Sequence, residues 1–139
     1  MGLDNGFQIR SRKNPDLAIE LTYFRKYYEL DDWCMQHCKH TEEFEVEVTK
    51  DDIDKLRSTI EPIAEALLRL GITKVGYYDE NGYPKKYDVA FYGNDFNPVY
   101  SRSFIAGVKL CRLYFALDNM YDVLEYNGDD IYITFYSSF

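Results

Sequence analysis

The 139-residue sequence has little of what several common protein classes require. No apolar run approaches the roughly 20 residues that span a membrane, and the first ten residues lack the apolar core of a signal peptide. Only three cysteines are present, which we interpret as thiols or metal ligands rather than a disulfide framework. We therefore expect a cytoplasmic protein.

Signatures of catalysis and of nucleic-acid binding are also missing. The sequence contains no Gly-rich phosphate loop, no nucleophile elbow and no His-Glu-x-x-His motif. Its basic clusters, Arg10/Arg12/Lys13 and Lys85/Lys86, are too short to follow a phosphate backbone, and the pI is about 4.7. We expect neither an enzyme nor a protein that binds nucleic acid directly.

Negative charge is concentrated in one segment. Ten of the 24 acidic residues fall between Glu29 and Asp54, where the only bases are Lys39 and Lys50. The other 14 acids face 14 bases, so this segment accounts for the whole net charge of −8. A concentrated negative field attracts basic partners, although an ordinary solvated face is the alternative. The partner-binding candidates here are Glu42, Glu43, Glu45, Glu47, Asp51 and Asp52.

The composition predicts one domain spanning residues 1–139. With 46% hydrophobic residues and no Gly/Ser linker, repeat or low-complexity tract, the chain suits a single core. We expect an α+β fold, in which about three helices cover at least one face of an antiparallel sheet.

Apolar spacing predicts the first elements. Gly6–Arg12 alternates as a strand, and the residues that follow predict a helix from about Pro15 to Cys38. The first turns of that helix could instead be a strand, because Ile19, Leu21 and Tyr23 alternate with polar residues.

The acidic segment contains a predicted half-solvated strand, Glu43–Val48. Three glutamates alternate there with three apolar residues, which puts the carboxylates on one face and the apolar groups on the other. The apolar residues are Phe44, Val46 and Val48.

A second helix is predicted from Thr49, whose side chain forms a capping box with Asp52, to Gly71. Pro62 predicts a kink or restart near Glu61. The buried stripe comprises Ile53, Leu56, Ile60, Ile63 and Leu67.

Two hairpins and a third helix are expected in the second half. Strands over Thr73–Tyr78 and Tyr87–Tyr92 flank the turn Asp79–Gly82. Strands over Tyr121–Tyr126 and Asp130–Tyr136 flank Asn127-Gly128. The third helix is capped by Ser101 or Ser103, ends near Asn119 and has the buried stripe Phe104, Val108, Cys111 and Phe115.

Tyrosines of the last strand are further partner-binding candidates. Tyr132 and Tyr136 alternate with apolar residues, so both fall on one face of the strand. Exposed there, they would offer contact area at a low entropic cost. The alternative is that helices cover both sheet faces and the tyrosines belong to the core.

The densest group of potential metal ligands is Cys34, His37, Cys38 and His40. On a helix the first three share one side, and His40 could join if the helix ends just before it. Thiolates and imidazoles in this proportion suit tetrahedral zinc, although the spacing matches no standard finger. The alternatives are core thiols with exposed histidines, and a hydrolase that uses Cys34 with His37.

Two segments carry a resemblance to a group of proteins. Met1-Gly-Leu-Asp-Asn-Gly6 and Leu21-Thr-Tyr-Phe-Arg-Lys-Tyr-Tyr28 look like small uncharacterised proteins encoded by phages and mobile elements. The resemblance implies a phage or prophage origin and a place in the cytoplasm of a bacterial host.

Small acidic phage proteins include anti-CRISPR inhibitors, some of which resemble DNA in charge and occupy the basic channel of an effector nuclease. The resemblance therefore implies an inhibitor of a host nucleic-acid-handling protein, such as a type II CRISPR effector. The alternatives are a zinc-binding structural or adaptor protein and a Cys-dependent hydrolase.

Overall fold

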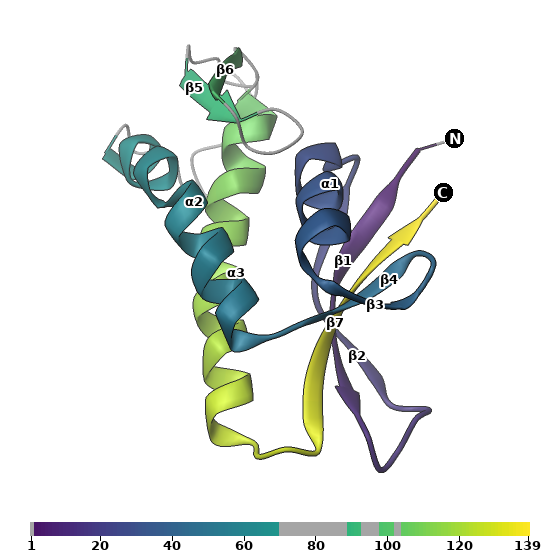
Figure 1. Cartoon of the computed structure of the whole chain (residues 1–139). Coiled ribbons are helices and arrows are strands. Elements are labelled where there is room, and N and C mark those ends of the chain that lie inside the picture. The colour runs from purple at the N-terminus through teal and green to yellow at the C-terminus, as the bar shows by residue number, and fades with distance from the viewer. Residues whose placement is uncertain (1, 70–88, 93–97, 102–103) are drawn as a thin grey trace, which may run out of the picture.

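Five antiparallel strands form the main sheet. The computed structural model describes residues 2–69, 89–92, 98–101 and 104–139, with side chains over 2–65 and 109–139. The strands follow the order β2-β1-β7-β4-β3, so the strand that is last in sequence is central (Figure 1). Their bounds are β1 Asp4–Ser11, β2 Ala18–Arg25, β3 Lys39–Glu42, β4 Glu45–Val48 and β7 Ile131–Ser138. A separate two-stranded sheet pairs β5 Val89–Tyr92 with β6 Pro98–Ser101.

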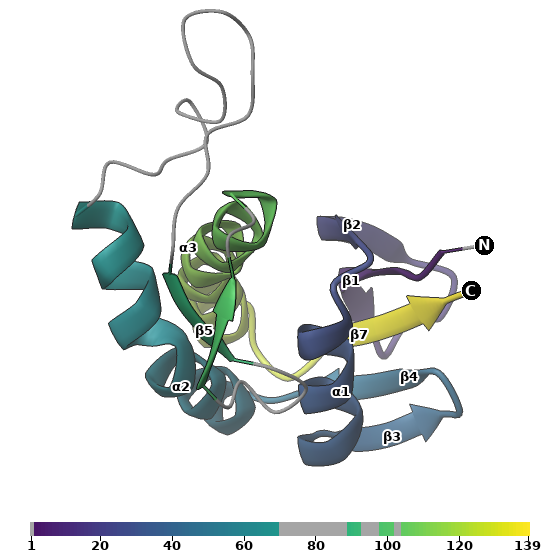
Figure 2. The ribbon, with the colours of Figure 1, turned by 90° about the horizontal axis from the view of Figure 1, so that it is seen from above.

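Three helices lie on one side of the main sheet, as Figures 1 and 2 show. They are α1 Tyr28–His37, α2 Lys50–Arg69 and α3 Phe104–Tyr126. Helix α2 runs beside α3. The predicted α+β fold is therefore confirmed. Within the described residues, no helix combines the length and apolarity needed to cross a membrane.

The core lies between the sheet and the helices. Its apolar residues alternate along β4 and β7 and recur at helical spacing on the helices. The sheet contributes Phe7, Val46, Val48, Ile133 and Phe135, and the helices contribute Leu30, Trp33, Ile53, Leu56, Ile60, Leu110, Leu113 and Leu117. The predicted capping box is confirmed, because the Thr49 amide donates to Asp52 Oδ2 over 3.0 Å and the Asp52 amide donates to Thr49 Oγ1 over 3.2 Å.

The predicted helix from Pro15 to Cys38 is wrong over its first half. Strand β2 occupies Ala18–Arg25, as the alternation of Ile19, Leu21 and Tyr23 had allowed, and α1 begins only at Tyr28. Antiparallel pairing with β1 supplies backbone hydrogen bonds to a distant segment, which local apolar spacing cannot reveal.

The predicted strand Tyr121–Tyr126 is also wrong. Helix α3 continues to Tyr126, because Leu117 and Met120 extend its buried face at helical spacing. Gly128, with φ +70°, follows the helix end, so Asn127-Gly128 joins a helix to β7. Phe115 was predicted to belong to the buried stripe of this helix, but it is half exposed. Cys111 is buried, as predicted.

Two smaller corrections concern α2 and the acidic strand. Helix α2 continues past Pro62 to Arg69, so the predicted restart near Glu61 does not occur, while the alternative, a kink at Pro62, stays a prediction. The strand predicted over Glu43–Val48 is shorter, since a turn at residues 43–44 separates β3 from β4 and leaves Phe44 exposed.

Several predicted features lie outside the described residues. They are the strand Thr73–Tyr78, the turn Asp79–Gly82, the helix end at Gly71 and the side chains of Leu67, Phe104 and Val108. The strand predicted at Tyr87–Tyr92 is confirmed over Val89–Tyr92, which pairs with β6.

Candidate functional site

One face of the sheet has no helix on it in the described structure; we call it the open face (Figure 2). Paired residues point to the same side of a sheet, so the register identifies what lies there. Tyr136 is flanked by Gly6 and Glu45, and Thr134 by Gln8 and Glu47. Tyr132 occupies the same face of β7. The structure thus gathers Glu45, Glu47, Tyr132 and Tyr136 on the open face.

Glu20 and Tyr23 of β2 also lie on the open face, although neither was predicted as a site residue. Their spacing of three would put them on opposite faces of a regular strand. An irregularity in the β1–β2 pairing inserts one extra β2 residue, so that Glu20 opposes Gln8 and Tyr23 opposes Gly6. No sequence signal in this segment distinguishes such a bulge from continuous alternation.

Hydrogen bonds already link many open-face side chains. The Tyr136 hydroxyl donates to Glu20 Oε1 over 2.7 Å, and the Tyr23 hydroxyl donates to Asp4 Oδ1 over 2.6 Å. Burial, and then the bond to Glu20, hold the pKa of Tyr136 well above its ordinary value. The tyrosine hydroxyls are therefore protonated donors with internal acceptors, and Thr134 beneath them is fully buried.

Arg12 shows what kind of group the open face can hold. Its guanidinium lies 3.1 Å from Glu47 Oε1 and stacks 4.4 Å from the centre of the Tyr132 ring. A carboxylate and an aromatic ring thus share one guanidinium, which combines an ion pair with a cation–π contact. Glu47 and Tyr132 consequently have an internal partner.

Apart from Glu47, which pairs with Arg12, the acidic candidates fall into two groups. Glu42 and Glu43 are exposed around the β3–β4 turn, and Glu45 follows at the start of β4. Asp51 and Asp52 instead lie in the first turn of α2, where carboxylates complement the positive end of the helix dipole. Asp52 also caps the helix, so these two aspartates have a structural role.

The β3–β4 turn presents an exposed aromatic pair. Phe44 is 49% exposed and Phe139 is 65% exposed, and their ring centres lie 5.6 Å apart in an edge-to-face arrangement. The Ser137 amide donates to the Phe44 carbonyl over 2.8 Å, which fixes the turn to β7. We call Glu42, Glu43, Phe44, Glu45 and Phe139 the hairpin tip. The contact with Phe139 had no sequence signal, because the two rings are distant in the chain.

The four predicted metal ligands are placed differently. Cys34 and Cys38 are buried, and burial, followed by a hydrogen bond with Cys38, raises the pKa of the Cys34 thiol well above its ordinary value. His37 stacks on Trp33, with ring centres 4.5 Å apart. His40 Nε2 lies 2.8 Å from the Met35 carbonyl oxygen.

Within the described part of the chain, no three His, Cys, Asp or Glu side chains lie where they could hold a metal ion. Zinc at Cys34, His37, Cys38 and His40 stays a prediction, and ligation would require the buried thiols to ionise and the His40 ring to turn. A protonated, buried thiol is also a poor nucleophile, so we do not propose a hydrolase.

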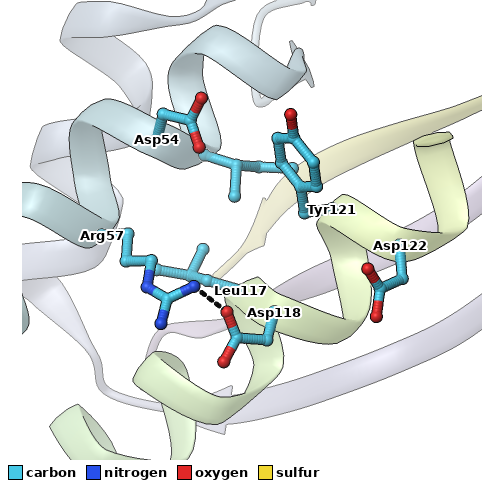
Figure 3. Close-up of a pocket in the computed structure, with 7 residues that line it drawn as sticks. Asp54, Arg57, Leu117, Asp118, Tyr121 and Asp122 are labelled. Carbon is cyan, nitrogen blue, oxygen red and sulfur yellow. Dashed lines mark hydrogen bonds and ion pairs between the residues drawn. The ribbon is translucent and has the colours of Figure 1, made fainter.

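A pocket of about 400 Å³ lies between α2 and α3 (Figure 3). Apolar, aromatic, acidic and basic side chains line it: Ile53, Asp54, Arg57, Leu117, Asp118, Tyr121 and Asp122. Figure 3 shows Arg57 paired with Asp118 and, away from this pair, Asp54 on α2 and Tyr121 on α3. This pocket was not predicted from the sequence, because Tyr121 and Asp122 were expected in a strand.

Comparison with known proteins does not identify a relative. No protein-family model matches the chain, and no curated protein or solved structure is significantly similar to it. Function must therefore be inferred from the geometry of this chain.

Proposed function

We propose that this chain is a non-enzymatic binding protein whose hairpin tip docks on the basic, nucleic-acid-binding surface of a host protein. The observation that carries the proposal is the exposed Phe44–Phe139 pair. Glutamates flank Phe44 in the sequence and lie on the adjoining strands β3 and β4. Exposed apolar groups with a polar rim are typical of protein interaction sites.

The charge of the hairpin tip favours a basic partner. Glu42, Glu43 and Glu45 bring three carboxylates to one turn, and none of them forms an ion pair within the described residues. Arginine or lysine side chains can pair with these carboxylates while stacking on the phenylalanine rings. The arrangement of Arg12 against Glu47 and Tyr132 is an intramolecular example of the same chemistry.

Burial of the aromatic pair would supply most of the lasting affinity. A phenylalanine side chain buries about 200 Å², so the exposed half of Phe44 offers about 100 Å² to a partner. At about 25 cal/mol per Å², covering this area contributes up to about 2.5 kcal/mol. Removing it should weaken binding up to about 60-fold. The carboxylates would mainly accelerate the encounter and make it sensitive to salt.

The class of host protein follows from the resemblance and the charge together. A phage-type acidic protein that occupies a surface made for phosphates would prevent nucleic acid from binding there. A type II CRISPR effector nuclease is the first candidate, which would make the protein an anti-CRISPR inhibitor. An adaptor that binds a basic replication or transcription protein would use the same chemistry.

The test is binding to a purified, guide-loaded type II effector at low and at moderate salt, with DNA cleavage as the second readout. Phe44→Ala should weaken binding strongly. Phe115→Ala is a matched control, because Phe115 is 50% exposed on α3 and truncation removes the same group. Equal binding of both variants would contradict the role of the hairpin tip.

Charge requires a separate comparison. Replacing Glu42, Glu43 and Glu45 with glutamine should slow association and reduce its salt dependence. The control neutralises three exposed acids elsewhere, Asp16, Glu65 and Asp129, and changes the net charge equally. If the effector is not retained at either salt concentration, the tagged protein is incubated with an extract of the host. Mass spectrometry then shows whether it retains another basic nucleic-acid-binding protein. Retention of none would refute the proposal.

A further inference from the structure

Helices α2 and α3 hold two of the chain's own cations in the same way. Lys50 Nζ lies 2.8 Å from Glu125 Oε2 and 5.8 Å from the centre of the Tyr121 ring. Two helical turns along, Arg57 pairs with Asp118, and its guanidinium carbon lies 5.2 Å from the centre of the Tyr114 ring. Each unit consists of a cation from α2 and a carboxylate and a tyrosine from α3.

The two units are related by a seven-residue repeat. Lys50 and Arg57, Tyr121 and Tyr114, and Glu125 and Asp118 are each separated by seven positions. Seven residues make nearly two helical turns, so equivalent positions recur along the contact between two antiparallel helices. The groove between α2 and α3 therefore repeats a cation-binding arrangement.

The pocket of about 400 Å³ lies between these two units. Ile53 and Leu117, which are almost completely buried, give it an apolar lining. Asp54 and Asp122 at its rim are exposed and form no ion pair or hydrogen bond within the described part of the chain. Arg57 is already neutralised by Asp118, so the pocket retains two negative charges.

We propose that this pocket is a second binding site, which takes an amine or guanidinium group carried on an aliphatic chain. The aliphatic chain would lie in the groove beside the Tyr121 ring, above the buried Ile53 and Leu117, and the carboxylates of Asp54 and Asp122 at the rim would attract the cationic group. The ring of Tyr121 would stack against it, as it does near Lys50. A volume of about 400 Å³ falls in the range of small-ligand sites and admits such a group readily.

Two kinds of molecule carry this chemistry: a free polyamine, and a lysine or arginine side chain of a protein partner. Spermidine represents the first, and N-acetyl-arginine methylamide and a short arginine-containing peptide represent the second. Tighter binding of spermidine than of the arginine probes assigns the site to a polyamine. The reverse order assigns it to a protein side chain.

The experiment is titration of the isotope-labelled full chain with each probe, followed by amide chemical shifts and calorimetry. We expect saturable shifts at Asp54, Leu117 and Asp122. The variant Asp54→Asn/Asp122→Asn should bind at least about tenfold more weakly, because it loses both unpaired charges. The control Glu65→Gln/Asp129→Asn removes the same charge outside the pocket and should bind like the unchanged protein.

Two results would overturn the proposal: an equal loss of affinity in both double variants, and shifts that spread over the acidic surface without saturating at the pocket. The site does not depend on the hairpin tip. Glutamine at Glu42, Glu43 and Glu45 should leave the titration unchanged, so failure of the hairpin tip to bind a host protein and failure of this pocket can be distinguished.

Discussion

Replacing Gly6 with alanine tests the close packing of the open face. Gly6 lies on β1 between Tyr23 and Tyr136. A Cβ atom there would lie 2.3 Å from the Thr22 carbonyl oxygen and 2.8 Å from Glu20 Oε1. The first contact involves backbone, so the β1–β2 pairing must shift, and the Glu20 carboxylate must leave its position beside the Tyr136 hydroxyl.

The expected loss of stability combines two costs and one gain. Forcing an extra carbon into packed structure costs about 1–3 kcal/mol, and loss of the hydrogen bond between Tyr136 and Glu20 costs about 1 kcal/mol. Alanine recovers about 0.4–1 kcal/mol by restricting the unfolded chain. We therefore expect Gly6→Ala to reduce the free energy of unfolding by about 1–3.6 kcal/mol, with a central value of about 2 kcal/mol.

Urea unfolding followed by the fluorescence of Trp33, the only tryptophan, measures this loss. With a slope of about 2 kcal/mol per M, the midpoint should fall by about 1 M. Gly2→Ala is the control, because its Cβ would come close only to the movable Lys26 side chain, with Cε at 2.9 Å. A Gly6→Ala midpoint equal to that of Gly2→Ala would refute the reasoning.

Three further predictions concern the α2 cap, a buried thiol and metal. Thr49→Ala removes the capping hydroxyl and should cost about 1 kcal/mol in urea unfolding, whereas equal stability would contradict the cap. Burial raises the pKa of Cys111 from 9.0 to about 11, so the unfolded thiol ionises first as the pH rises. The free energy of unfolding should therefore fall between about pH 9 and 11, by up to roughly 2–3 kcal/mol from this group. In Cys111→Ala it should fall less steeply. Equal pH dependence of the two proteins would contradict this role of Cys111. Elemental analysis of protein purified without chelator tests zinc at Cys34 and Cys38, and less than about 0.2 zinc per chain would argue against a stable site.

Local signals predicted the parts of the fold that local interactions determine. The capping box of Thr49 and Asp52 formed as expected, and Ile53, Leu56 and Ile60 are buried along α2. Alternation in the last strand correctly separated Ile133 and Phe135 from the polar face, because the side-chain period of a strand is two.

Features that depend on distant partners could not be predicted in this way. Strand β2 carries a bulge whose existence depends on β1, and the bulge brings Glu20 and Tyr23 to one face. The aromatic part of the hairpin tip requires Phe139 to reach Phe44 through the β4–β7 pairing. The pocket depends on α3 continuing to Tyr126, where the Asn127-Gly128 turn signal had predicted a hairpin strand.

The central position of β7 has a consequence for how the chain folds. Before β7 is made, β1 can pair only with β2, and β4 only with β3, which leaves two separate hairpins. Isolated hairpins are marginally stable in water, and each would expose an unpaired edge. Contacts between distant residues then join them in one late step, which favours slow, cooperative folding. Disrupting β7 would therefore divide the sheet in two.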